Sequence, residues 1–365
     1  MAKYIPILLL FACDNDAKPQ EIVPASPSSI AHAFGLDAAQ LGGPLIDPEK
    51  PAGDLTADLA AFTSVETCMK QRAASLDPLV GDAVDAIGYD TLLRDACRIL
   101  EAAKSKDAKK CELIDASALR QRCRSVTAMV VGDPDGCPFK APTKPDLGRD
   151  ATCVAAALRS PAMCMGAQRR DRPACEALLD HDTKKCDSLP LDDQRVPCAR
   201  DATRFRTALP GSPSIASVAA AKGTLVVHGD GRPDPAQTSA DLDGELGSGV
   251  VVVLAGAGRQ RISFGRFGDA TSTPRATQPL ERTRFALTFS ASGDKLQVIE
   301  SSLTVTGATQ SSCMGDTCKL AVKVTKLEPK RGGALEMTVD GTLGGYRIQA
   351  DIATFVRDVV TATTP

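Results

Sequence analysis

Residues 180–198, DHDTKKCDSLPLDDQRVPC, hold two cysteines, one histidine and a group of carboxylates. Metal sites, redox sites and disulfides can all contain such a set. Structural zinc takes ligand pairs about two to four residues apart, because one loop supplies two corners of a tetrahedron. Thioredoxin-like redox centres use Cys-x-x-Cys at the start of a helix. Cys186 and Cys198 fit neither spacing and lie on either side of SLPLDD, so the stretch predicts a disulfide across a turn, with His181 as a surface residue.

The same arrangement recurs through residues 55–206, which contain ten of the thirteen cysteines. One type of cysteine follows Asp or Ser by four positions, in DAKKC, DPDGC, SPAMC and DTKKC. The other follows Arg by three positions, in RDAC, RQRC, RPAC and RVPC, and the two types alternate. Apolar residues recur there every three or four positions, the period of a helix that buries one face, and Asp or Ser caps a helix through its first N–H groups. The region therefore predicts a disulfide-rich α-helical repeat domain, in which Cys68 and Cys153 fit the pattern poorly. Such repeats resemble those of uncharacterised exported prokaryotic proteins, a resemblance that implies no activity.

Geometry favours one pairing of these cysteines. In CELIDASALRQRC the turn near Asp115–Ser117 leaves Cys111 and Cys123 about equidistant from it. Two antiparallel helices then bring their Cα atoms within the ~4.4–6.8 Å that a disulfide requires. No central turn separates Cys97 from Cys111. The scheme, extended to the hairpin SCMGDTC, predicts the pairs Cys68–Cys97, Cys111–Cys123, Cys137–Cys153, Cys164–Cys175, Cys186–Cys198 and Cys313–Cys318.

Residues 207–365 change from helical to strand patterns. Val, Thr, Ile and Phe alternate with polar residues in RFALTFS, KLAVKVTKL, ALEMTVDG and GYRIQADI, and with similar runs they make about eight strands. Short links such as SASGD and PKRGG suit antiparallel hairpins. The pattern predicts an antiparallel β-sandwich or small barrel, with a short helix at ATFVRDVV. The expected fold class is thus multidomain α + β.

The N-terminus, MAKYIPILLLFAC, has a basic residue and an apolar run that ends at Ala12-Cys13. It resembles the signal peptide of bacterial lipoproteins, whose lipobox precedes the cysteine that is lipidated, although Phe11 departs from the usual small residue and the run is short. The resemblance implies a signal peptide over 1–12, a lipid anchor on Cys13 and a place in the bacterial cell envelope, facing the periplasm or the cell exterior. Setting Cys13 aside leaves an even number of cysteines for disulfides in an oxidising compartment. The alternative is a short buried strand with a free cysteine.

Composition limits the possible partners. Residues 13–54 are rich in Pro, Gly, Ser and Ala and predict a flexible tether. The whole chain carries 43 basic and 45 acidic residues, 4% aromatic residues and no Trp. No block of like charge indicates a nucleic acid, and aromatic stacking on bases or sugars is not expected. No other apolar run approaches the ~18–20 residues that span a bilayer, so the membrane is expected as a partner through the lipid alone.

No catalytic signature is found in the sequence. The nucleophile elbow G-x-S-x-G is absent. His228, Asp230 and Asp234 follow a predicted strand in VVHGDGRPD and form a weak candidate site, because loops at strand ends often carry function. The segment VVVLAGAGRQR lacks the third glycine and the helix of a dinucleotide site, and DLDGELG lacks the distal Glu of a calcium loop. Neither a metal nor a cofactor is predicted.

The leading hypothesis is a non-enzymatic, lipid-anchored envelope protein that acts as a binding or assembly scaffold. One alternative is an envelope hydrolase with its site on the β-domain loops near His228. Another is a disulfide-stapled helical inhibitor.

Overall fold

The computed structural model describes residues 54–70, 89–141, 144, 147–167, 171–209, 211–228, 236–238, 249–255, 258–267, 283–293, 295–305 and 311–361. The chain divides into two compact units, Met1–Asp47 and Pro48–Pro365, and the described residues all belong to the second. Cys13, the expected signal peptide and nearly all of the expected tether lie outside them. No described helix is long and apolar enough to cross a membrane.

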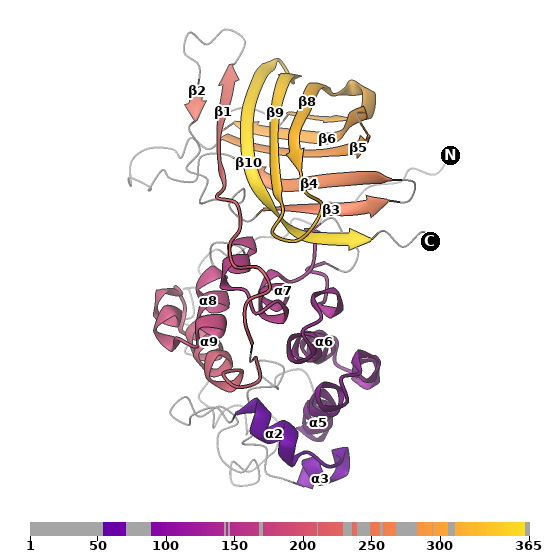
Figure 1. The fold of residues 1–365 in the computed structure, drawn as a ribbon, viewed down its shortest axis with the longest axis vertical. Coiled ribbons are helices and arrows are strands. Elements are labelled where there is room, and N and C mark those ends of the chain that lie inside the picture. Colours follow the sequence, from indigo (N-terminus) through magenta and orange to yellow (C-terminus); the bar gives the residue numbers. More distant parts are fainter. Residues whose placement is uncertain are drawn as a thin grey trace, which may run out of the picture. The chain divides into compact units, whose positions relative to one another are not determined.

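Short helices make up the first half of the described chain (Figure 1). The α-helices are α2 (Leu55–Ala61), α3 (Val65–Lys70), α5 (Tyr89–Ser105), α6 (Ser117–Val131), α7 (Ala151–Ala157), α8 (Arg172–Asp180) and α9 (Asp192–Arg204). Between them lie the 3₁₀ turns η3 (Ala108–Leu113), η4 (Pro134–Gly136), η6 (Pro161–Gly166) and η7 (Thr183–Ser188). Helices this short are marginal in isolation, so their stability has to come from packing and cross-links.

Four of these helices end in the same turn. The residue after the last helical turn has positive φ in each case: Lys106, Gly132, Arg159 and His181. The next residue donates its N–H to an alanine carbonyl five positions earlier, in the bonds Asp107–Ala102, Asp133–Ala128, Ser160–Ala155 and Asp182–Ala177, at 2.9–3.1 Å. This is the bond of a Schellman motif, which satisfies a carbonyl at a helix end.

The four residues that donate these N–H groups, Asp107, Asp133, Ser160 and Asp182, are also the N-cap residues of the 3₁₀ turns. The carboxylates of Asp107, Asp133 and Asp182 each accept a hydrogen bond from the N–H two positions later, which confirms the predicted capping role. Ser160 differs, because its hydroxyl donates to the carbonyl of Ile215 instead.

Six disulfides cross-link the chain, in the pairs predicted from the sequence. Five lie among the helices, Cys68–Cys97, Cys111–Cys123, Cys137–Cys153, Cys164–Cys175 and Cys186–Cys198, with Cα atoms 5.6–5.9 Å apart. The sixth, Cys313–Cys318, closes a turn between strands. The ten helical cysteines are buried, most of them in one apolar cluster with residues such as Ile99, Val126 and Phe205. The cross-links are therefore part of the core.

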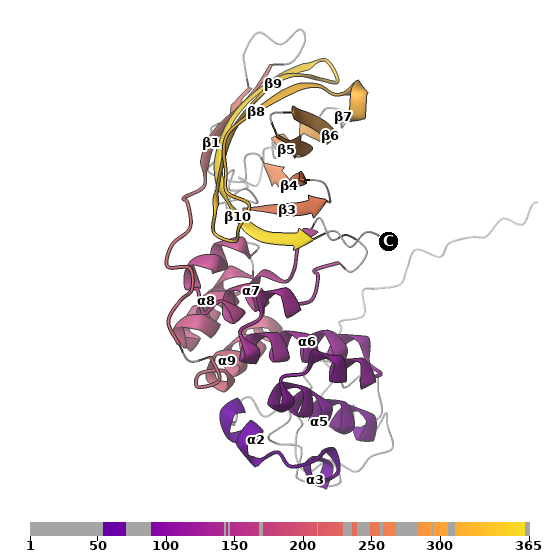
Figure 2. The same cartoon turned by 45° about the vertical axis from the view of Figure 1, so that its right-hand side comes forward.

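Strands make up the second half of the described chain. They are β1 (Lys222–His228), β2 (Ala236–Thr238), β3 (Val250–Ala255), β4 (Arg259–Phe267), β5 (Thr283–Ser292), β6 (Lys295–Val305), β7 (Ser311–Met314), β8 (Lys319–Leu327), β9 (Ala334–Leu343) and β10 (Tyr346–Thr361), with the 3₁₀ turn η8 (Gly315–Thr317) between β7 and β8. They form one ten-stranded sheet, which is strongly curled (Figure 2).

The last strand, β10, joins the two parts of this sheet. Its first residues pair antiparallel with β1 on one side and β9 on the other, and its last residues, from Val356, pair parallel with β3. The sheet continues from β3 through β4, β5 and β6 to β7. Apolar side chains from both parts meet in one cluster, which includes Val252, Phe289 and Ile352.

Two expectations about this region are corrected. ATFVRDVV is strand and not helix, because it belongs to β10. The sheet is mixed and not wholly antiparallel, because β10 has 16 residues and runs past the ends of β1 and β9 to lie beside β3. The first residues of β10 therefore have antiparallel neighbours, β1 and β9, and its last residues have a parallel neighbour, β3.

Helices and strands share part of one core. Phe355 of β10 is 1% exposed and belongs to the apolar cluster of the helices. The partly buried Ile215 and Val218, from the segment between α9 and β1, pack against the same cluster. The helical and strand regions are thus parts of one compact unit.

Candidate functional site

The residues proposed from the sequence cannot be assembled into a site. His228 is the last residue of β1, where its backbone pairs with Arg347. Asp230 and Asp234 lie outside the described residues. Within the described part of the chain, no group of three or more His, Cys, Asp and Glu side chains is placed to hold a metal ion.

The structure has instead a cleft of about 310 Å³ where the helices meet β10. Its walls come from the segment between η4 and α7, from α8 and α9, and from Arg357 of β10. Apolar and small residues cover much of the wall: Leu147, Ala151, Gly166, Ala167, Ala174, Leu178, Leu189 and Pro197. Charged residues complete it: Lys140, Arg149, Asp150, Asp171, Asp201 and Arg357. Specific pockets in proteins combine apolar walls with a few polar groups in this way.

The segment between η4 and α7 is fixed at both ends. The Cys137–Cys153 disulfide joins its ends, and Phe139 and Arg149 form an isolated antiparallel bridge within it. The Asp150 carboxylate caps α7 by accepting the N–H of Cys153 at 2.7 Å. The Arg149 guanidinium lies over the Phe139 ring, 4.9 Å from its centroid, a distance at which a cation is attracted to the ring face. One wall of the cleft is therefore held in place by covalent and polar contacts.

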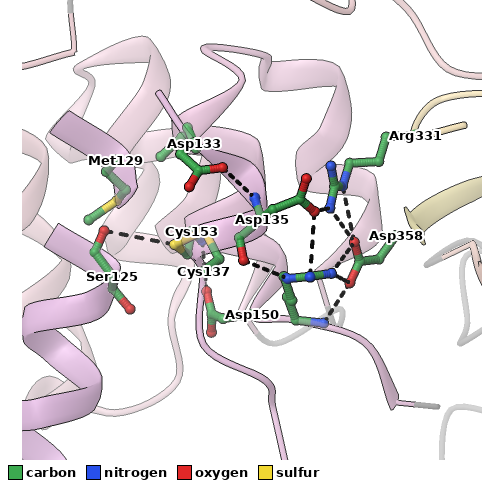
Figure 3. Close-up of a disulfide and its surroundings, with 12 residues drawn as sticks. Ser125, Met129, Asp133, Asp135, Cys137, Asp150, Cys153, Arg331 and Asp358 are labelled. Carbon is green, nitrogen blue, oxygen red and sulfur yellow. Dashed lines mark hydrogen bonds and ion pairs between the residues drawn. A yellow bond between two sulfur atoms is a disulfide. The ribbon is translucent and has the colours of Figure 1, made fainter. Parts of the chain in front are cut away.

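An ion-pair cluster beside the cleft ties this segment to β10 (Figure 3). The Asp358 carboxylate accepts hydrogen bonds from the backbone N–H and the guanidinium of Arg149, at 2.8 and 3.2 Å. Arg331 donates to the same carboxylate at 3.0 Å and to Asp135 at 2.6 Å. The side chain of Asp358 is 3% exposed and that of Arg149 is 10% exposed. The two arginines and two carboxylates balance in charge; Asp358 is the buried carboxylate, whereas the side chain of Asp135 is 67% exposed and lies at the surface of the cluster.

The charges in this cluster shift two pKa values. Burial alone would raise the pKa of Asp135, but the hydrogen bond and charge of Arg331, with the charge of Arg149, lower it below its ordinary value. Burial alone would lower the pKa of Arg331, but Asp135 and Asp358 outweigh it and raise that pKa. Each partner therefore stabilises the ionised form of the other.

Arg357 and Asp358, adjacent in β10, contact different residues of the segment between η4 and α7. Asp358 binds Arg149 and Arg331, whereas Arg357 donates to the carbonyl of Leu147 at 2.9 Å and lines the cleft. The register between β10 and β3 shifts between Val356 and Asp358, so Arg357 lies at an irregularity of the strand, where the side chains no longer alternate regularly. The cleft exists only where the helical segment and β10 meet.

The cleft combines apolar walls with charged side chains that could contact a ligand. The lining residues include no histidine among those the structure describes, and their one cysteine, Cys198, is in a disulfide. The cleft also holds three aspartates, Asp150, Asp171 and Asp201, the first of which caps α7. Its volume is at the lower end of the ~300–1,000 Å³ of small-molecule pockets, so it is large enough for a small ligand or for one or two side chains of a partner.

Sequence reasoning missed Arg149, Arg331 and Asp358. A weak signal was present in FVRDVV, where a charged pair interrupts an apolar run of a strand. A carboxylate in such a run is a candidate for a buried ion pair, because buried charges are paired.

No protein family model matches this chain, no curated protein is similar to it, and no solved structure matches its fold.

Proposed function

We propose that this protein is a lipid-anchored protein of the bacterial cell envelope that acts as a non-enzymatic binding scaffold. In this proposal residues 1–12 are a signal peptide, Cys13 carries the lipid and residues 13–54 are a tether. The helical region is a degenerate repeat, and the curled sheet forms the other domain of the protein. The partner is a protein that binds at the cleft beside β10.

The observation that carries the proposal is the complete pairing of the later cysteines. The twelve cysteines after Cys13 form six disulfides. Disulfides of this number form and persist in oxidising compartments, such as the bacterial periplasm or the cell surface. These six disulfides account for twelve of the thirteen cysteines, which leaves Cys13 for the lipid that the proposal assigns to it.

The repeat is supported by two segments with matching contacts, residues 101–123 and 176–198. In the first, Lys110 pairs with Glu101 at 2.7 Å and Arg120 donates to the carbonyl of Ile114 at 2.9 Å. In the second, the corresponding contacts are Lys185–Glu176 at 3.7 Å and Arg195–Leu189 at 2.6 Å. Each segment contains a capping Asp and a disulfide between cysteines twelve residues apart. Matching contacts at matching positions are typical of a structural repeat.

The scaffold interpretation is supported by the character of the cleft. Its walls are prearranged by a disulfide, an N-cap and the Asp358 cluster, and preorganisation lowers the entropy cost of binding. Leu147 is 42% exposed and lines the cleft, so an apolar side chain is already presented to a partner.

The anchor is tested by labelling the full chain in a bacterial host with radioactive palmitate, followed by detergent phase partition. The native protein is expected to take up label and enter the detergent phase, and Cys13→Ala is expected to do neither. The double variant Cys313→Ala/Cys318→Ala is the matched control, because it removes two cysteines but leaves Cys13. Labelling of Cys13→Ala at the native level would exclude the lipid anchor.

The binding site is tested by site-specific photo-crosslinking in intact cells. A photoreactive amino acid replaces Gln194, an exposed residue of the cleft, or Thr338, an exposed residue of β9 that does not line the cleft. A discrete adduct from position 194 that is absent from position 338 supports the cleft as the contact surface. Identical adduct patterns from the two positions, or none from position 194, would contradict it.

A further inference from the structure

Met314 occupies an unusual place for a large apolar side chain. It is 70% exposed, the most exposed of the large hydrophobic residues that the structure describes. Three other methionines, Met129, Met163 and Met337, are between 1% and 3% exposed and belong to the cores. Met69 and Met165 are partly buried against the helical core. Met314 is therefore the described methionine that meets solvent most freely.

The loop that carries Met314 is closed by a disulfide and by hydrogen bonds. The Cys313–Cys318 disulfide closes it, with Cα atoms 5.0 Å apart. The Thr317 hydroxyl accepts the N–H of Met314 at 3.0 Å and donates to its carbonyl at 2.8 Å. The N–H of Cys318 binds the carbonyl of Gly315, and Gly315 has φ of 54°. The exposure of Met314 is thus built into a cross-linked turn.

The sulfur of Met314 also has a defined polar neighbour. The capping arrangement of η8 places the Met314 side chain beside the backbone N–H of Thr317, the last residue of that turn. A thioether is a weak acceptor, whereas the oxygen of a sulfoxide is a much stronger one. Oxidation would therefore place a better acceptor beside a donor that is already there, at a position where no core packing is disturbed.

We propose that Met314 is a reversible oxidation site that reacts with hydroperoxides. The sulfur lone pair attacks the terminal oxygen of the hydroperoxide, a sulfur–oxygen bond forms and the oxygen–oxygen bond breaks. The sulfur loses two electrons, and the peroxide gains them and leaves as an alcohol, or as water when the oxidant is hydrogen peroxide, after the terminal proton moves to the departing oxygen. Methionine sulfoxide reductases reverse this step. The inference does not depend on the lipid anchor.

The test exposes the folded full chain to hydrogen peroxide and follows each methionine by peptide mass mapping. Met314 is expected to gain one oxygen at least about ten times faster than Met129, Met163 and Met337, because susceptibility follows exposure. The protein oxidised at Met314 alone is expected to keep its melting temperature, and a mixture of both stereospecific methionine sulfoxide reductases is expected to restore it. Met314→Leu should lack the fast phase and keep the native fold.

Three results would overturn the proposal. One is oxidation of Met314 at the rate of the core methionines, and another is faster oxidation of Met69 or Met165. The third is a sulfoxide at Met314 that unfolds the protein or resists both reductases.

Discussion

The Arg149 guanidinium lies 3.2 Å from the Asp358 carboxylate, although 209 residues separate them in the chain. The contact joins the disulfide-closed segment between η4 and α7 to the last strand of the sheet. Arg331 approaches the same carboxylate from the turn between β8 and β9, at 2.9 Å. Asp358 is therefore the common partner through which three distant pieces of chain meet.

Replacing Asp358 by Ala is expected to destabilise the protein by about 3–5 kcal/mol, because it leaves two largely buried arginines with only the exposed Asp135 as a counter-ion. The measurement is the free energy of unfolding in urea. Asp340→Ala is the matched control, since Asp340 is 58% exposed and its ion pair with Arg347 is 3.7 Å long. Exposed pairs contribute little, so the control should unfold close to the native midpoint. Equal midpoints for the two variants would show that the cluster does not hold the regions together.

Gly148, next to Arg149, provides a second test of this junction. Its φ is +72°, and an added Cβ would lie 2.9 Å from Cγ2 of Val251 in β3. Gly258 has the same φ, but an added Cβ there would meet nothing within 4 Å. Alanine at either site costs about 1–3 kcal/mol of backbone strain, and Gly148→Ala adds a clash with β3. Gly148→Ala should therefore have a lower urea midpoint than Gly258→Ala. A lower midpoint for Gly258→Ala would mean that the segment does not lie against β3.

Five of the six disulfides join cysteines 5–16 residues apart, across a turn that can be read locally; Cys68–Cys97, 29 residues apart, was predicted only by extending the same scheme. Cys186 and Cys198 flank SLPLDD, and the capping Asp182 fixes where the 3₁₀ turn starts. Such information is contained within some twenty residues of sequence. The cleft is different, because Arg149 and Arg357 each look like an ordinary surface charge until the chain brings them together.

The wrong prediction at ATFVRDVV has a similar physical cause. Phe355 and Val356 are adjacent and both buried, because Phe355 packs on the helical core and Val356 on the core of the sheet. A strand covered on both sides loses the alternation that marks a strand with one solvent face. The resulting apolar pattern resembles that of a helix, and only the position of the helices beside β10 resolves it.

The capping residues allow the repeat to be tested by energetics. Asp107 and Asp182 accept the same type of hydrogen bond, at 3.0 and 3.1 Å. Each change to Ala is expected to cost about 1 kcal/mol in urea unfolding, and the two costs should agree because the surrounding contacts match. Asp187→Ala, an exposed change within η7, is the control for a mere loss of charge. Unequal costs for the two caps would argue against equivalent repeat units.

Asp95 predicts a specific pH dependence. Its side chain is buried in α5, it accepts the N–H of Ala116 before α6 at 3.4 Å, and Arg98 lies 3.7 Å away. Burial raises the pKa of Asp95 above its ordinary value. A carboxyl group with a raised pKa stabilises the fold at pH values below its unfolded pKa, and this contribution is lost as pH rises through the folded pKa. Asp95→Asn, which stays neutral, should therefore have a higher urea midpoint than the native protein at pH 7, by an amount that shrinks toward pH 4.

The control for this experiment is Asp187→Asn, because Asp187 is exposed and is not among the charges that act on Asp95. Its urea midpoint should follow that of the native protein across the pH range. A constant difference between Asp95→Asn and the native protein from pH 4 to pH 7 would show that Asp95 does not titrate in the way its burial implies.

The disulfides are expected to differ in their contribution according to the loops they close. Cys68 and Cys97 are 29 residues apart, whereas Cys313 and Cys318 are 5 apart. In the chain-entropy model, removing the first cross-link by double alanine substitution costs about 3.5 kcal/mol and removing the second about 2 kcal/mol. The urea midpoint of the first variant should therefore fall further, and burial adds to the difference because Cys97 is fully buried and Cys318 is partly exposed. A lower urea midpoint for the variant without Cys313–Cys318 would contradict this prediction. The short cross-link would then stabilise the protein mainly through contacts in the folded state, and restriction of the unfolded chain would be the smaller effect.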